Sequence, residues 1–344
     1  MAINSKKIPK KEFQIFTSKS KINKRGVFFT FIALFIIILI IAIVSTKQRF
    51  RYTQKSNAIA SRIRTMNNFI DDYEKDIERE IYIGGYRALI SMNSYIRQLQ
   101  DYVIDFDTIF NEILVNGTAN GTAMELMTQE SQGASINSWL IRVNEEAGNL
   151  NIEINVDVHD VRVEHISPFV VRVKANLTSE IVDSKGLAEW TINKVYFKDF
   201  SIIGFEDPLY TVETTDKITV LINVTPSMDF VNEATNDTGV LQNHVENNFY
   251  INDSKGPSFL MRYTGNLSAS EFGIVSFVNP EDLSAQLGSY KSRSLVDYVY
   301  FANHTTTDYC NFQNMSNWFR LDQDNLETYE VDGGSIAMNG NDIK

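Results

Sequence analysis

The sequence predicts an α+β protein with one N-terminal transmembrane helix that continues as a long amphipathic helix, an antiparallel sheet packed on that helix, and a C-terminal α+β lobe. Three observations support this fold class: an uncharged apolar run at residues 27–44, apolar residues at helical spacing from Ile59 to Ile113, and alternating apolar residues between 152 and 203. The chain has 344 residues, 43% of them hydrophobic, which is too apolar for a disordered protein.

The composition and charge exclude several classes of protein and of site. Cys310 is the only cysteine, which excludes intrachain disulfides and zinc or iron–sulfur sites with several cysteine ligands. The net charge of −11 argues against nucleic acid as a partner. No motif for catalysis, metal binding or cofactor binding stands out, so we expect a protein that is not an enzyme and holds no cofactor.

The apolar run VFFTFIALFIIILIIAIV contains no charged side chain. Eighteen residues of helix extend about 27 Å, close to the hydrocarbon thickness of a bilayer, about 30 Å. No small-x-small cleavage site directly follows Val44, so we interpret the run as a lasting anchor rather than a secretory signal. The predicted order is therefore a basic cytoplasmic leader at 1–26 and a transmembrane helix at 27–46.

The charges on either side of the run predict its orientation. Residues 1–25 contain eight Lys and Arg and one Glu, a charge of +7, so the remaining residues carry −18. Cations before the first span favour a cytoplasmic N-terminus and an extracytoplasmic C-terminal part of a single-pass membrane protein. Six further cations follow the run before the first acid and reduce this asymmetry: Lys47, Arg49, Arg51, Lys55, Arg62 and Arg64.

Nine Asn-x-Ser/Thr sequons follow the apolar run, and none precedes it. About five are expected by chance from the Asn, Ser and Thr content of this part of the chain. The excess favours a glycoprotein with its sequons at the cell surface, and an Asn-rich polar surface without glycan is the alternative. The candidate acceptors are Asn116, Asn120, Asn176, Asn223, Asn236, Asn252, Asn266, Asn303 and Asn314.

A long amphipathic helix is predicted at 47–114, because its apolar residues recur at alternating spacings of three and four, as in a coiled coil. No proline lies between Pro9 and Pro168 to interrupt it. The pair Gly84-Gly85 coincides with an irregular step in the apolar stripe, where we expect a kink or a close backbone contact. The stripe is a stalk or assembly surface, a core helix beneath its own domain, or both, with the first half exposed to partners and the second half buried by the sheet.

The rest of the chain divides at residue 205. The part at 115–205 predicts a loop at 116–122, a short helix at 135–147, and three antiparallel strands between 152 and 203 with a bulge or turn at 159–160. The part at 206–344 is an acidic, Asn-rich α+β lobe. Its predicted strands are 217–224 and 294–301, and its predicted helices are 240–249, 280–287 and 322–329.

Isolated polar residues offer little chemistry. His159 and His165 have the same parity on a predicted strand and about 20 Å between them, too far to share a metal, so we interpret both as solvent-facing. Cys310 and His304 have the side chains of a thiol nucleophile and its base, but a free buried cysteine is the simpler interpretation of Cys310. The acidic run at 322–327 lacks the central Gly and distal Glu of a calcium loop, which favours the first turn of a helix.

The junction Lys24-Arg25-Gly26, directly before Val27 and the apolar helix, resembles the class III signal of type IV pilins and pilin-like proteins, especially archaeal ones. The resemblance implies cleavage by a prepilin peptidase between Gly26 and Val27, and a long helix followed by an antiparallel sheet. It also implies other pilin-like subunits as partners through that helix. Two departures are Phe31, where many pilins carry Glu at the fifth mature position, and a chain about twice the length of a major pilin.

These observations together predict a pilin-like, membrane-anchored surface structural or assembly subunit, a minor or tip subunit rather than a major pilin. The alternative is a single-span anchored extracytoplasmic binding or adhesion protein, whose long helix is only a stalk. An anchored enzyme is the third interpretation, and no cluster of catalytic residues in the sequence favours it.

Overall fold

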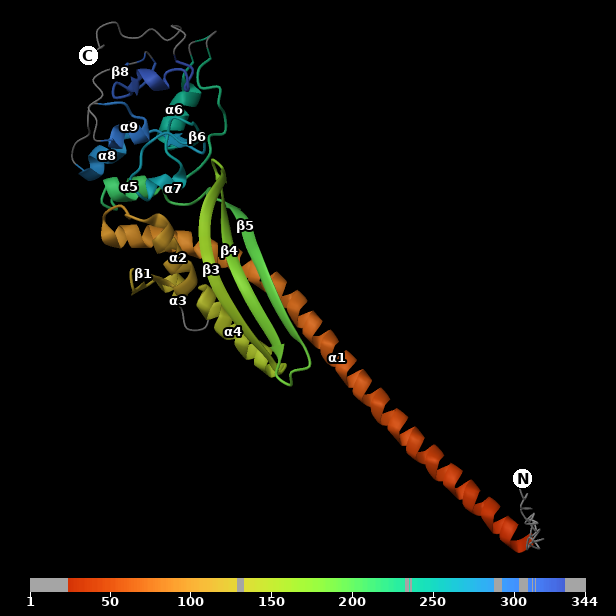
Figure 1. Ribbon diagram of the computed structural model, residues 1–344. Coiled ribbons are helices and arrows are strands. Elements are labelled where there is room, and N and C mark those ends of the chain that lie inside the picture. Colours follow the sequence, from red (N-terminus) through yellow and green to blue (C-terminus); the bar gives the residue numbers. More distant parts are fainter. Residues whose placement is uncertain are drawn as a thin grey trace, which may run out of the picture. The chain divides into compact units, whose positions relative to one another are not determined.

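The computed structural model describes residues 24–128, 133–232, 235, 237–287, 293–302, 309–310, 312 and 314–331 (Figure 1). The chain contacts divide it into two compact units, Met1–Arg64 and Thr65–Lys344. The fold is mixed α+β, as predicted, with antiparallel sheets in the second unit. The finer domain boundaries stay predictions.

Helix α1 (Lys24–Leu99) has 76 residues and belongs to both units. In the first unit its apolar side chains between Phe28 and Val44 are exposed. From Met66 onward the apolar stripe is buried, and this buried stripe begins the continuous core of the second unit. Helix α1 is therefore continuous to Leu99, but its apolar stripe is buried by the rest of the chain only from Met66 onward.

The single helix predicted for 47–114 is wrong after Leu99. Gln100 adopts a positive φ of 52°. A new helix, α2 (Phe106–Asn116), begins where the Asp105 side chain accepts a hydrogen bond from the Thr108 amide at 3.1 Å. Apolar residues keep their helical spacing across the turn, so the pattern hides the break. The turn is held from outside the helix, because the amide of residue 103 donates to the Tyr263 carbonyl at 3.0 Å.

Strands β3 (Ile152–Ser167), β4 (Val170–Asp183) and β5 (Glu189–Ser201) form an antiparallel sheet in the order β3-β4-β5. This confirms the predicted three-stranded meander. The register shifts between Val158 and Asp160, which confirms the predicted bulge. An extra residue there moves the following apolar positions to the opposite parity, so that they return to the buried face.

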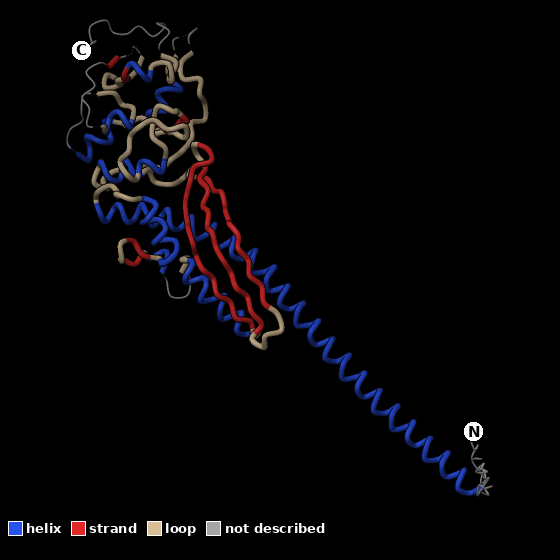
Figure 2. Tube along the Cα trace, viewed as in Figure 1, coloured by secondary structure: helices blue, strands red, loops and turns tan. Residues whose placement is uncertain are grey.

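The second-unit part of α1, together with α2 and α4 (Ile136–Asn149), covers one face of this sheet (Figures 1 and 2). Helices α2 and α4 contact β3, whereas α1 reaches β4 and β5. The Tyr73 hydroxyl lies 2.5 Å from the Ser179 hydroxyl on β4. On β5, Lys194 and Lys198 bind carboxylates of α1 at 3.2 and 2.8 Å. The opposite face carries mostly polar side chains, as expected for an antiparallel sheet covered on one side, together with the exposed Val195 and Phe197.

Gly84 and Gly85 allow α1 to approach its neighbours on two sides. A Cβ atom at Gly84 would lie 2.8 Å from the Ala134 carbonyl oxygen and 2.8 Å from Leu114 Cδ1. A Cβ atom at Gly85 would lie 2.9 Å from Val173 Cγ2 on β4. The predicted close contact at this pair is confirmed, and the helix continues through it.

Shorter elements connect these layers. The predicted loop at 116–122 is a tight hairpin of β1 (Thr118–Ala119) and β2 (Thr122–Ala123), turned by Asn120 and Gly121 with φ of 47° and 77°. Two positive φ values in succession match a type I′ turn, which Asn-Gly favours. Helix α3 (Glu125–Thr128) follows, and the predicted helix at 135–147 is confirmed as α4, capped by the Ser135 side chain.

The remaining elements are short. They are α5 (Pro208–Glu213), α6 (Gly239–Glu246), β6 (Tyr250–Asn252), α7 (Phe259–Arg262), β7 (Ile274–Ser276), α8 (Pro280–Leu287), α9 (Asp297–Phe301), β8 (Tyr309–Cys310), β9 (Leu321–Asp322) and the 3-10 turn η1 (Gln323–Asn325). The helices predicted at 240–249 and 280–287 are confirmed as α6 and α8. The helix predicted at 322–329 is wrong, because Asp322 ends β9 and only η1 and turns follow it.

Two predicted strands in this region are wrong. Residues 217–224 make only single bridges, from Leu221 to Glu206 and from Val224 to Tyr250. Residues 294–301 contain α9 instead of a strand. Short apolar runs fit either period, and here tertiary contacts decide the conformation.

Candidate functional site

The apolar segment of α1 is the most distinctive surface of the described chain. Its most apolar 18-residue window has a mean hydropathy of 3.1 and is 0% buried. Phe35, for example, is 65% exposed. Among the described residues this is the one helix long and apolar enough to cross a membrane. An exposed apolar surface of this extent is unfavourable in water and requires lipid or other apolar helices around it.

The four predicted processing residues, Lys24, Arg25, Gly26 and Val27, lie in the first turns of α1. Gly26 is exposed, and a Cβ atom there would meet nothing within 4 Å. Cleavage between Gly26 and Val27 stays a prediction. The structure adds that the fold does not require glycine at this position, so a substitution there tests processing alone.

Seven of the nine predicted glycosylation acceptors lie among the described residues, and Asn236 and Asn303 lie outside them. Asn176 is half-buried in the central strand β4, paired with both neighbouring strands. The other six described acceptors are exposed: Asn116, Asn120, Asn223, Asn252, Asn266 and Asn314. Their exposure is compatible with glycosylation, which stays a prediction.

The two strand histidines lie in different environments, so the prediction that both face solvent on one side is wrong. His159 is exposed at the bulge and lies 2.7 Å from the Thr178 hydroxyl. His165 is half-buried, stacks on Phe272, and accepts a hydrogen bond from the Leu260 amide at 3.3 Å. Burial lowers the pKa of His165. The bulge separates the two rings, because it reverses the parity between them.

The remaining candidates from the sequence do not form a reactive cluster. Cys310 is a free, half-buried thiol whose pKa is raised by burial, and His304 lies outside the described residues. Asp322 accepts hydrogen bonds from the Asn325 amide group at 2.8 and 3.0 Å. No group of three His, Cys, Asp or Glu side chains that could hold a metal occurs in the described part of the chain.

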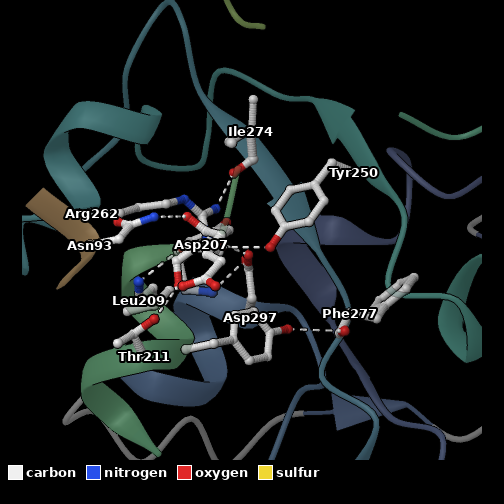
Figure 3. A network of polar contacts seen from close by, with 12 residues as sticks. Asn93, Asp207, Leu209, Thr211, Tyr250, Arg262, Ile274, Phe277 and Asp297 are labelled. Carbon is white, nitrogen blue, oxygen red and sulfur yellow. Dashed lines mark hydrogen bonds and ion pairs between the residues drawn. The ribbon is translucent and has the colours of Figure 1, made fainter. Parts of the chain in front are cut away.

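A buried ionic cluster that was not predicted from the sequence surrounds Arg262 (Figure 3). Arg262 Nη1 lies 2.6 Å from Asp207 Oδ2 and 2.7 Å from Asp297 Oδ2, and all three side chains are fully buried. The Tyr250 hydroxyl donates to Asp207 Oδ2 at 2.6 Å, and Arg262 Nη2 donates to the Ile274 carbonyl. The cluster connects α5, α7, α9, β6 and β7.

This cluster is closed to solvent and has a structural role. Burial raises the pKa of Asp297 to about 6, although the positive charge of Arg262 favours the ionised carboxylate. Two carboxylates share one guanidinium in this buried cluster, and loss of that cation would leave buried charge without its partner, which is very unfavourable. The Asp207 side chain also caps α5, accepting from the Leu209 amide at 2.9 Å, and Pro208 occupies the first turn. The pair Asp207-Pro208 is the signal in the sequence that could have predicted where this helix begins.

A groove between α1 and α4 has a volume of about 450 Å³. Phe69 and Tyr73 of α1 and Trp139 of α4 line its apolar part, and Trp139 Nε1 donates to Asp76 at 2.7 Å. Glu80, 7% exposed, lies close by and pairs with Arg142 at 3.5 Å. Burial raises the pKa of Glu80 to about 7.

Comparison with protein-family models, with curated proteins and with solved structures finds no match to this chain. The functional argument therefore depends on the residues and the geometry described above.

Proposed function

We propose that the chain is a pilin-like, membrane-anchored surface subunit with a structural or assembly role, minor or located at a tip. The observation that carries the proposal is the continuity of α1. Helix α1 contains both an exposed, uncharged apolar segment and, further along, a buried apolar stripe beneath a three-stranded antiparallel sheet. The first part would be anchored in lipid or packed among like helices, and the second organises a folded exterior domain.

The basic leader supports a cytoplasmic N-terminus and an extracytoplasmic C-terminal part. In this arrangement the partners are the membrane, a prepilin peptidase that removes residues 1–26, and other pilin-like subunits that contact the apolar helix. The function requires no catalytic group, cofactor or metal of its own.

The mass of the membrane-bound protein tests this proposal, in cells that contain a prepilin peptidase. Cleavage after Gly26 removes 26 of 344 residues, about 3 kDa of 39.3 kDa, and leaves Val27 at the N-terminus. Gly26→Val should retain the leader, because the peptidase cuts after a small residue. Gly26→Ala is the matched control and should be cleaved, because alanine is also small and a Cβ atom at this position meets nothing within 4 Å.

An intact Lys24-Arg25-Gly26 in the membrane-bound wild-type protein would refute the pilin-like proposal. That result would favour the second candidate, a single-span anchored binding or adhesion protein. The groove between α1 and α4 favours this candidate specifically, because it offers an apolar floor and a charged rim in the second unit.

A further inference from the structure

The part of α1 that follows the apolar segment is strongly basic, and we call residues 47–64 the basic neck. It contains six cations and no acid, and the first acid after the apolar segment is Asp71. The first four cations are exposed. No ion pair among the described residues involves any of those four, so their charges are available to a partner outside the chain.

Three of these cations form a stripe on one side of the helix. Lys47, Arg51 and Lys55 are separated by four residues each. At about 100° per residue, the three side chains lie within an arc of about 80°. Arg49 lies on another side of the helix. We call Lys47, Arg51 and Lys55 the cationic stripe.

The stripe begins where the apolar segment ends. Measured from Val44 along the helix axis, Lys47 lies about 4.5 Å, Arg51 about 10.5 Å and Lys55 about 16.5 Å away. The headgroup layer of a bilayer extends roughly 5–7 Å beyond the hydrocarbon, and Lys and Arg side chains extend several ångströms along the helix. Lys47 and Arg51 therefore reach the headgroups, and Lys55 acts within about one Debye length of them.

We propose that the cationic stripe is a docking surface for the anionic headgroups of the membrane in which the apolar segment is anchored. The inference rests on the anchoring role given above to residues 27–44. The ligand chemistry is a phosphate carried by a lipid, because ammonium and guanidinium groups bind phosphate oxygens and the stripe adjoins the span. Binding on one side favours a helix that leans toward the headgroups on that side.

The test uses the purified full chain in lipid nanodiscs that contain phosphatidylcholine and 30 mol% phosphatidylglycerol, a composition chosen for the assay. After transfer to mild detergent, the lipids retained by the protein are quantified by mass spectrometry. The stripe variant is Lys47→Gln, Arg51→Gln and Lys55→Gln. The control variant removes three exposed cations elsewhere, Arg64→Gln, Lys185→Gln and Lys217→Gln, and thus changes the net charge equally.

We expect the wild type and the control to enrich the anionic lipid over the bulk ratio. Each cation near an anionic surface strengthens binding roughly fivefold, so the stripe variant should lose most of the enrichment. Salt at 0.5 M should have the same effect. Equal enrichment in the stripe variant, or equal loss in the control, would overturn the inference. Loss of enrichment on adding 10 mM inorganic phosphate at constant ionic strength would assign the stripe to free phosphate instead.

Two further measurements separate the possible failures. If the wild-type chain is extracted from vesicles by alkaline carbonate, the membrane anchor fails, and this inference fails with it. If the chain resists extraction but shows no anionic enrichment, only the inference fails. If the wild-type chain shows no anionic enrichment and the stripe variant changes its oligomeric mass, the partner is an acidic surface of a second copy, and this result would also overturn the inference.

Discussion

Replacing Gly84 by Ala should destabilise the second unit, although alanine is the better helix former. Gly84 lies on α1 where the helix meets both Leu114 and the segment before α4. The added methyl group would lie 2.8 Å from the Ala134 carbonyl oxygen and 2.8 Å from Leu114 Cδ1. Both separations are shorter than van der Waals contact. The Leu114 side chain can rotate, but the carbonyl belongs to backbone and moves only if the segment moves.

Two opposing effects determine the magnitude. Overpacking a filled core costs about 1–3 kcal/mol, whereas Gly→Ala in a helix contributes about 0.8–1.0 kcal/mol of stability. Because the obstacle is backbone, the steric cost should lie in the upper half of its range, about 2–3 kcal/mol, and the net loss should be about 1–2 kcal/mol. At a urea slope of about 3 kcal/mol/M, the unfolding midpoint should fall by roughly 0.3–0.7 M.

Gly148→Ala is the matched control. Gly148 also lies in a helix, α4, but an added methyl group there meets nothing within 4 Å. Its stability should stay unchanged or rise by a few tenths of a kcal/mol. Urea unfolding of the full chain in mild detergent, followed by near-ultraviolet circular dichroism, measures both variants. If Gly84→Ala proves as stable as Gly148→Ala, the close-packing argument is refuted.

Two other substitutions test buried charges. Arg262→Met should cost about 3–5 kcal/mol in urea unfolding, because Asp207 and Asp297 lose their shared cation inside the core; a loss below about 1 kcal/mol would contradict the structural role of the cluster. Glu80 has a folded pKa of about 7 against an ordinary value of 4.5, so the folded state keeps a proton that the unfolded state loses, and stability falls as pH rises between these values. Glu80→Gln does not ionise, so its advantage over the wild type should grow across that window, by up to about 3 kcal/mol, and stay constant above it. An advantage that does not vary with pH would show that Glu80 does not titrate there.

Elements with a strong local pattern could be predicted from the sequence. The uncharged run is a helix, the three alternating segments form the meander, and the slip at 159–160 is a bulge. Helix α4 begins at the predicted Ser cap. In each case the interactions that stabilise the element involve residues close together in the chain, so helical or strand periodicity and capping residues indicate it.

Elements that depend on distant contacts could not be predicted. The end of α1 at Leu99 has neither Pro nor Gly beside it, and the turn is held by the Tyr263 carbonyl, 160 residues further along the chain. Residues 294–301 fit a strand pattern, yet Asp297 enters α9 and pairs with Arg262. His165 is shielded by Phe272, which no local pattern indicates.

The sequence by itself determined the apolar segment, the basic residues on both sides of it, the candidate processing junction and the sequons, because charge and hydropathy are properties of the residues alone. Only the tertiary structure decided at which residue the buried part of the long helix begins, where that helix ends, and which charges meet. Arg262 and Glu80 show the physical reason. Their energies depend on the loss of water and on partners from other elements, and both are established only when the chain has folded.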